Sequence, residues 1–127
     1  MKKHERPSLA VFHNLPSGGG ARVLFGMLEH LCRVYDVTVH FPEGSEMPSS
    51  PAGLTLMEWP FPRGRRIRGL RRAMAPVSLK ARLRELDALC GKMAEEINGS
   101  ADLVLVHNSM YVAAPPLLRY LQPPSAY

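Results

Sequence analysis

The chain has 127 residues, of which 46% are hydrophobic and 21% are charged. This size and composition suit one domain over residues 1–127 with a real core, and they exclude a two-domain enzyme and wholesale disorder. The net charge of +5 indicates an anionic partner. Apolar stretches such as residues 103–106 are far shorter than the roughly 20 residues of a membrane-spanning helix. The apolar run at residues 9–12 is too short for a signal peptide, so we expect a cytoplasmic protein.

The first half of the chain alternates between predicted strands and a predicted helix. The apolar run at residues 9–13 predicts a buried strand, and helical spacing of apolar residues follows from Ala21 to about Val34. β-Branched residues at 36–41 predict a second strand, and a weaker run at 54–59 predicts a third after a loop. Because a helix joins the first two strands, we expect them to run parallel.

The second half continues the pattern. Apolar residues at alternating spacings of four and three predict a long helix over 79–97, with a stop signal at residues 98–99. The run at 101–107 predicts a central fourth strand, and residues 111–121 predict a helix whose two prolines sit in its first turn or make it start late. A fifth strand is expected where residues 123–127 end the chain, which looks cut off in mid-fold. These elements predict a Rossmann-like three-layer α/β domain with a parallel sheet ordered 3-2-1-4-5 and an incomplete fifth strand.

Polar residues and glycines gather where the first and fourth strands end. In this strand order the two strands are neighbours, and a crevice opens between their carboxyl ends. His13 closes the first strand, while His107 and Asn108 close the fourth, so two imidazoles and an amide lie at the crevice. Arg22 would add a bidentate cation. Three glycines before the first helix would let the backbone approach phosphate oxygens: Gly18, Gly19 and Gly20.

Each of these features also has a simpler explanation. The glycines would serve a tight turn, and a histidine at a strand end is more often a surface or hydrogen-bonded residue, as for His40. A dinucleotide site is disfavoured because Val23 breaks the G-x-G-x-x-G spacing. No metal-ligand cluster of a known spacing occurs, so we expect no metal. We interpret Cys32 and Cys90 as core thiols.

The basic charge is concentrated in one segment. Nine of the sixteen bases lie between residues 63 and 84 without an acid, and the rest of the chain carries 7 bases and 11 acids. The segment is either a solvated face or a surface for an anionic membrane, because apolar residues recur among its arginines at spacings of three and four. Nucleic acid is less favoured because aromatic residues are missing from the run. Its first ten residues include Arg63, Arg65, Arg66, Arg68, Arg71 and Arg72.

Residues 9–24, LAVFHNLPSGGGARVL, and residues 35–40, YDVTVH, resemble the opening of GT-B glycosyltransferases of the family-4 type. Residues 101–108 resemble the fourth-strand segment of that family. The resemblance implies the acceptor-side domain of an enzyme whose second domain, absent here, binds a nucleotide-sugar and carries a pair of glutamates. It also implies metal-independent transfer with retention of configuration, a glycan or lipid-linked acceptor, and no turnover by this domain alone.

The resemblance also implies roles for individual residues. Residues 18–20 would approach the donor diphosphate from across the cleft, with Arg22 standing where the family often has Glu. His107 would line the acceptor side as the catalytic candidate, beside His13 and Asn108. Two other classes stay open: a non-catalytic binding module with a basic surface, and a fragment of a nucleotide-dependent reductase or epimerase.

We expect the chain to bind anionic vesicles through its basic segment. Each cation near such a surface contributes about 1 kcal/mol, so the arginines of residues 63–72 hold a small domain there reversibly. The Debye length falls from about 10 Å at 0.1 M salt to about 3 Å at 1 M, so co-sedimentation should need anionic lipid and fade as salt rises. Replacing Arg65, Arg66, Arg71 and Arg72 by Gln should abolish it. Equal binding to neutral vesicles would contradict this prediction, and stronger retention on duplex DNA at matched salt would favour nucleic acid.

Overall fold

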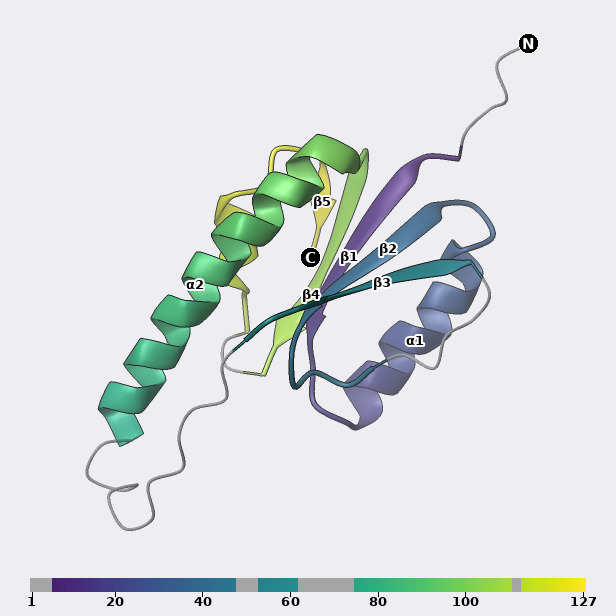
Figure 1. The fold of residues 1–127 in the computed structure, drawn as a ribbon. Helices are drawn as coiled ribbons and strands as arrows, with labels where there is room; N and C mark the ends of the chain where they lie inside the picture. Colours follow the sequence, from purple (N-terminus) through teal and green to yellow (C-terminus); the bar gives the residue numbers. More distant parts are fainter. Residues whose placement is uncertain (1–5, 48–52, 62–74, 111–112) are drawn as a thin grey trace.

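The fold is built on a five-stranded, all-parallel sheet, as the computed structural model of residues 6–47, 53–61, 75–110 and 113–127 shows (Figure 1). The sheet order is β3-β2-β1-β4-β5, and each neighbouring pair is parallel. The predicted order and the Rossmann-like α/β class are therefore confirmed. The strands are β1 (Ser8–Asn14), β2 (Asp36–Pro42), β3 (Leu54–Trp59), β4 (Leu103–Ser109) and β5 (Ser125–Ala126).

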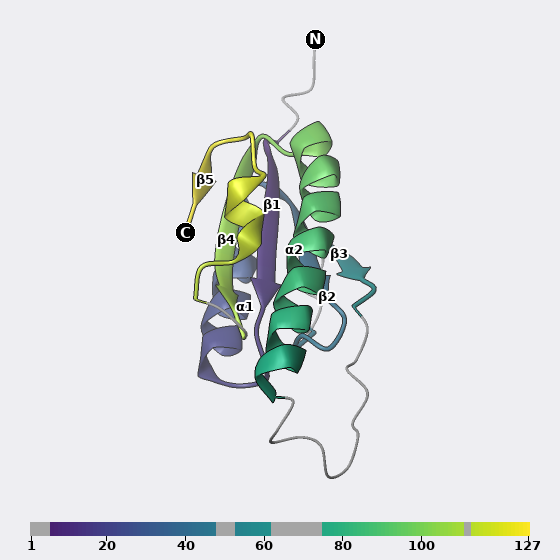
Figure 2. The same ribbon diagram turned by 90° about the vertical axis from the view of Figure 1, so that its left-hand side faces the viewer.

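Helices cover both faces of the sheet and make three layers. Helix α1 (Gly19–Leu31) lies on one face, and helix α2 (Ala75–Ser100) lies on the other beside the short 3₁₀ helix η1 (Pro116–Arg119) (Figures 1 and 2). Alternating side chains of β1 supply both cores: Val11 packs on the α1 side, and Phe12 packs on the α2 side. Both are completely buried. Burial on two faces explains why β1 reads as an unbroken apolar run.

Helix α2 is longer than its sequence pattern predicts. It begins at Ala75, so Pro76 falls in the first turn, where proline costs no hydrogen bond. It also continues through Asn98 and Gly99, the predicted stop. The Asn98 amide donates to the carbonyl of Tyr120 and accepts from the N–H of Gln122, at 2.9 Å in each case. Asn98 therefore holds residues 120–122 against α2, and the helix does not end at this residue.

The helix predicted over residues 111–121 is wrong. Among the residues described there, only the four of η1 are helical, and residues 111–112 lie outside the described ranges. Pro115 has an extended backbone with ψ of 144°, and consecutive prolines supply no N–H donors for an α-helical turn. Side chains hold this segment against α2, since Arg119 and Tyr120 both donate to the Asp87 carboxylate.

The two cysteines lie on opposite sides of the sheet. Cys90 is completely buried in the α2-side core, as predicted, and burial raises the pKa of its thiol to about 12. Cys32 is only half-buried, packed against the α1-side core, so its interpretation as a core thiol is wrong. The difference arises because Cys32 follows the last turn of α1, where the chain leaves the sheet. The sheet between them prevents a disulfide.

Adjacent residues on α1 provide a test of this packing. Leu24 is fully buried, whereas the neighbouring Val23 is 64% exposed. We expect Leu24→Ala to lower the free energy of unfolding by about 2–5 kcal/mol, because it leaves a cavity between α1 and the sheet. Val23→Ala should change it by less than about 0.5 kcal/mol. Urea unfolding measures both, and equal destabilisation would contradict the orientation of α1.

Candidate functional site

The carboxyl ends of β1 and β4 meet at a bulge. Phe12 pairs with Val106, but Asn14 pairs with Ser109, so two residues of β4 stand opposite the single residue His13. An extra residue bends a strand and re-aims its side chains, and bulges are frequent beside functional sites. The two residues opposite His13 are His107 and Asn108, one of them the extra residue, and the sequence analysis placed both at this end of the sheet. No sequence pattern marks the bulge.

His13 is buried between the sheet and α1. Its ring is fully inaccessible, stacks on Phe41 at 5.5 Å between centroids and meets Phe25 of α1 edge-on at 5.6 Å. Nδ1 accepts a hydrogen bond from the N–H of Leu15 at 3.3 Å, which leaves the proton of a neutral ring on Nε2. Among the described residues, Nε2 has no hydrogen-bond partner. An unsatisfied buried donor is costly, so this group lowers the stability of the fold.

Electrostatics couple His13 to the end of β4. Burial, and secondarily the charge of His107, lower the pKa of His13 from 6.5 to about 4. His107 is half-buried, and its Nδ1 accepts from the N–H of Asn108 at 2.8 Å. Asn108 is exposed, and its side-chain oxygen accepts from the Tyr127 hydroxyl at 2.8 Å. The structure thus brings His13 and His107 together, with His107 and Asn108 reachable from solvent and His13 behind them.

The glycine loop lies at the same end of the sheet, where α1 begins. Gly18 has φ of 150° and ψ of −164°, a backbone conformation that is essentially restricted to glycine. Gly19 and Gly20 are helical and need no such conformation. A Cβ on Gly19 would meet no atom within 4 Å, and one on Gly20 would make ordinary contact with Leu15. The backbone of the turn therefore requires glycine at Gly18 alone, and not at Gly19 or Gly20. Arg22 is exposed in the first turn of α1.

A buried polar network beneath the site was not predicted from the sequence. The Asn14 side chain is 1% exposed; it donates to the Ser109 hydroxyl at 2.9 Å and accepts from the Ser45 hydroxyl at 3.0 Å. The Asn14 carbonyl also accepts from the N–H of Met110 at 2.7 Å. These bonds join the last residues of β1 and β4 to the loop that follows β2. The residues are far apart in sequence and form no motif, so nothing in the sequence singled them out.

Other predicted features are not placed here. The arginines of residues 63–72 lie outside the described residues, so the membrane surface stays a prediction. Within the described ranges, His, Cys, Asp and Glu side chains form no group of three that could hold a metal ion. No helix in those ranges has the length and apolar character needed to cross a membrane.

Comparison with known proteins yields no relative. Protein-family models, curated proteins and solved structures all gave no match to this chain. The class that the structure itself defines is a Rossmann-like α/β domain with a parallel 3-2-1-4-5 sheet. Assignment of a function therefore depends on the site.

Two buried histidines should make the fold sensitive to acid. Burial lowers the pKa of His13 and of His40 from the usual 6.5 to about 4, and the Nδ1 of His40 accepts a hydrogen bond from the Trp59 indole. Between about pH 4 and pH 6.5 the unfolded chain binds more protons than the folded chain, because these histidines are protonated only when unfolded. Stability should therefore fall as the pH falls from about 6.5 to about 4, by about 3 kcal/mol for each histidine.

Urea unfolding between about pH 4 and pH 7.5 measures this dependence. His13→Phe and His40→Phe should each flatten the curve, because each removes one group that must bury a neutral imidazole. His30→Gln, at an exposed position on α1, is the control and should leave the slope unchanged. A wild-type curve that is flat from pH 4 to pH 6.5 would contradict the prediction.

Proposed function

We propose that this chain is the acceptor-side domain of a glycosyltransferase that moves a sugar from a nucleotide-sugar donor to an acceptor. The observation that carries the proposal is the surplus of glycine at the start of α1. Two helical glycines cost roughly 1 kcal/mol each relative to alanine, and neither the backbone nor contacts with described residues require them at Gly19 and Gly20. Their missing side chains leave backbone N–H groups open to a large ligand.

The chemistry of this end of the sheet supports a diphosphate-bearing ligand. The first N–H groups of a 13-residue helix point toward solvent there, and the helix dipole favours anions. Arg22 is a cation in the same turn. The N-terminus of α1 and Arg22 would bind and position the diphosphate of the donor. This role suits a domain that faces a donor held by another domain.

His107 is the residue best suited to meet the acceptor. It is half-buried, its Nδ1 is occupied by the Asn108 N–H, and its Nε2 is left to donate to or exchange a proton with a hydroxyl. Asn108 and the Tyr127 hydroxyl that it accepts from border the same place. In the family that the sequence resembles, nucleotide-sugar binding and a pair of glutamates belong to a second domain, so the proposal assigns donor binding and turnover to such a domain.

Substitutions of the glycines separate an effect on the free energy of unfolding from an effect on nucleotide-sugar use. Gly19→Ala should leave the free energy of unfolding unchanged or raise it by up to about 1 kcal/mol, because it restricts the unfolded chain. Gly18→Ala should lower it by about 1–3 kcal/mol, because alanine is strained at its backbone angles. In the chain joined to a donor-binding domain, Gly19→Val should lower nucleotide-sugar use at least about tenfold by excluding the diphosphate.

His107→Ala tests the acceptor side in the same joined protein. We expect an unchanged far-ultraviolet circular dichroism spectrum and a loss of turnover of about 10²-fold or more. Wild-type activity in both Gly19→Val and His107→Ala would overturn the proposal. Sugar transfer by the 127-residue chain unaided would contradict the assigned division of labour, and tight binding of a nicotinamide cofactor would favour a reductase instead.

A further inference from the structure

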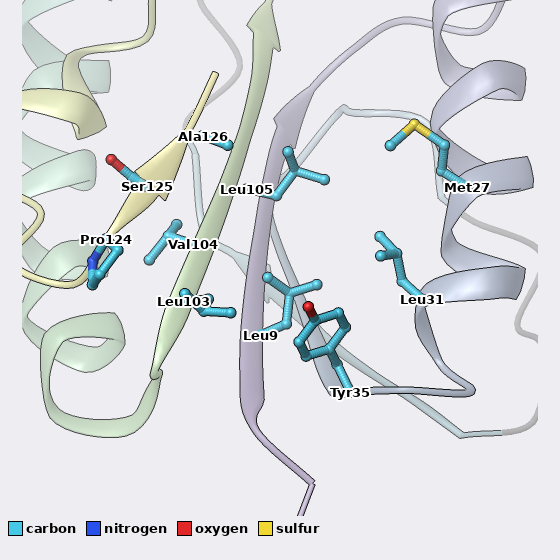
Figure 3. A pocket seen from close by; sticks show the side chains of 10 residues that line it. All are labelled: Leu9, Met27, Leu31, Tyr35, Leu103, Val104, Leu105, Pro124, Ser125 and Ala126. Atoms are coloured by element: carbon cyan, nitrogen blue, oxygen red, sulfur yellow. The ribbon is translucent and has the colours of Figure 1, made fainter.

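A small polar pocket lies toward the amino ends of β1 and β2, where the last residue of α2 borders it. Its volume is about 220 Å³, below the roughly 300–1,000 Å³ of pockets for drug-sized ligands. By contrast, the groove between α1 and strands β1, β4 and β5 is lined by hydrocarbon side chains except for Tyr35 and Ser125 (Figure 3). Five of the eight residues that line the polar pocket have polar side chains: Ser8, Asp36, Thr38, His40 and Ser100.

The polar side chains of β2 all lie on one face of the strand. The other face consists of buried apolar side chains, Val37, Val39 and Phe41. Thr38 and His40 pair with Ala10 and Phe12, two residues of the α2-side core, so they lie on the α2 side of the sheet. Strand β2 contributes no residue to that core. Because a strand between two layers is normally apolar on both faces, packing alone does not explain the polar face of β2.

His40 distinguishes this face from an ordinary solvated surface. The residue is only 2% exposed, although it lines the polar pocket. Burial lowers the pKa of the imidazole to about 4, so the ring is neutral at pH 7. Its Nδ1 accepts from the Trp59 indole at 3.2 Å, and the single proton of the neutral ring is therefore on Nε2. The Trp59 bond leaves this Nε2–H as a donor for a group in the pocket.

The remaining polar groups define the class of ligand. The Ser100 hydroxyl donates to the Glu96 carbonyl at 2.7 Å, so it offers the pocket an acceptor. Asp36 is an acceptor only, and the lining contains no cationic side chain that could pair with an anion. A simple cation suits the pocket no better, because it brings no acceptor for His40. A hydroxyl group both donates and accepts, so a neutral molecule with several hydroxyls matches the whole lining.

The spacing along β2 limits the size of this molecule. Asp36 and His40 are four residues apart in the strand, roughly 13 Å between Cα atoms. A six-membered ring with hydroxyl groups on opposite sides, plus one hydrogen bond of about 2.8 Å at each end, spans a distance of this order. Thr38 lies between the two on the same face, and Ala10 and Ala101 offer apolar contact to the carbon skeleton.

We propose that the polar pocket binds a small neutral polyol, a monosaccharide or a cyclitol, at a site separate from the glycine loop and His107. Hydroxyl groups of the ligand donate to Asp36 and accept from the Nε2–H of His40. None of residues 18–22 or 107–110 lines the pocket. The inference goes beyond the proposed function, since that function places an anionic diphosphate at the N-terminus of α1.

Nuclear magnetic resonance of the 127-residue chain tests the pocket with four probes: glucose, myo-inositol, cyclohexanol and inorganic phosphate. We expect glucose and myo-inositol to shift the amide signals of residues 36–40 and 100–101 saturably, with a Kd of about 1 mM. Cyclohexanol has the ring with one hydroxyl and should cause no saturable shift there. Inorganic phosphate should leave these signals unchanged, because the lining has no cation.

Substitutions on two neighbouring strands locate the binding. Thr38→Val keeps the branched shape and removes one hydroxyl from the lining, so glucose binding should weaken about two- to tenfold. His40→Phe removes the Nε2–H donor and should weaken it at least about fivefold. Thr55→Val is the matched control, because Thr55 pairs with Thr38, is exposed and lies outside the lining. Its Kd should equal that of the wild type, and a dispersed amide spectrum verifies that each variant folds.

The outcomes separate this inference from the proposed function. The absence of a saturable shift at residues 36–40 with both polyols would overturn the pocket assignment, and so would equal weakening by Thr38→Val and Thr55→Val. Phosphate binding at residues 36–40 would contradict a neutral ligand. Saturable shifts confined to residues 107–110 would overturn the pocket and support the proposed function. Polyol binding in the pocket together with wild-type sugar transfer in Gly19→Val and His107→Ala would overturn the proposed function alone.

Discussion

The pairing of β1 with β4 is the contact on which the rest of the molecule depends. Connections run toward β3 on one side of this pair and toward β5 on the other, so the helices fall on opposite faces of the sheet. His13 and His107 come together at the carboxyl ends of this pair. Among the described residues, an apolar groove lies between α1 and strands β1, β4 and β5. A different neighbour for β1 would remove both features at once.

The sequence was sufficient where one physical signal dominated. Strands buried on both faces read as continuous apolar runs, and the long helix shows a regular apolar stripe, so strand order and layers were predictable. The errors arise where side chains compete with local signals. Asn98 bonds the C-terminal arm and lets α2 run past a stop signal. Pro115 and Pro116 deny the backbone its donors, so η1 replaces a predicted helix.

The candidate site was predicted in part for the same reason. Histidines and glycines at strand ends are visible in the sequence, and parallel topology brings them to one edge. The bulge at His107 and Asn108 depends on the pairing of β4 with β1, two strands that are far apart in the sequence. The burial of His13 between Phe25 and Phe41 likewise depends on the tertiary structure. Asn14 meets Ser45 and Ser109 only in the folded chain. Sequence patterns report the period and composition of a local segment. These contacts join residues that are far apart in the sequence, so no local pattern indicates them.

The Asn14 network has a thermodynamic consequence for recognition. Asn14, the last residue of β1, is hydrogen-bonded to Ser109 and Met110 at the end of β4 and to Ser45 in the loop after β2, so folding itself fixes the relative positions of these segments. Ordering a flexible connection opposes association, because each residue that is fixed loses roughly 1–2 kcal/mol of conformational entropy at 25 °C. Connections that are already ordered spare an incoming molecule this loss. The carboxyl ends of β1 and β4 are thus preorganised for association.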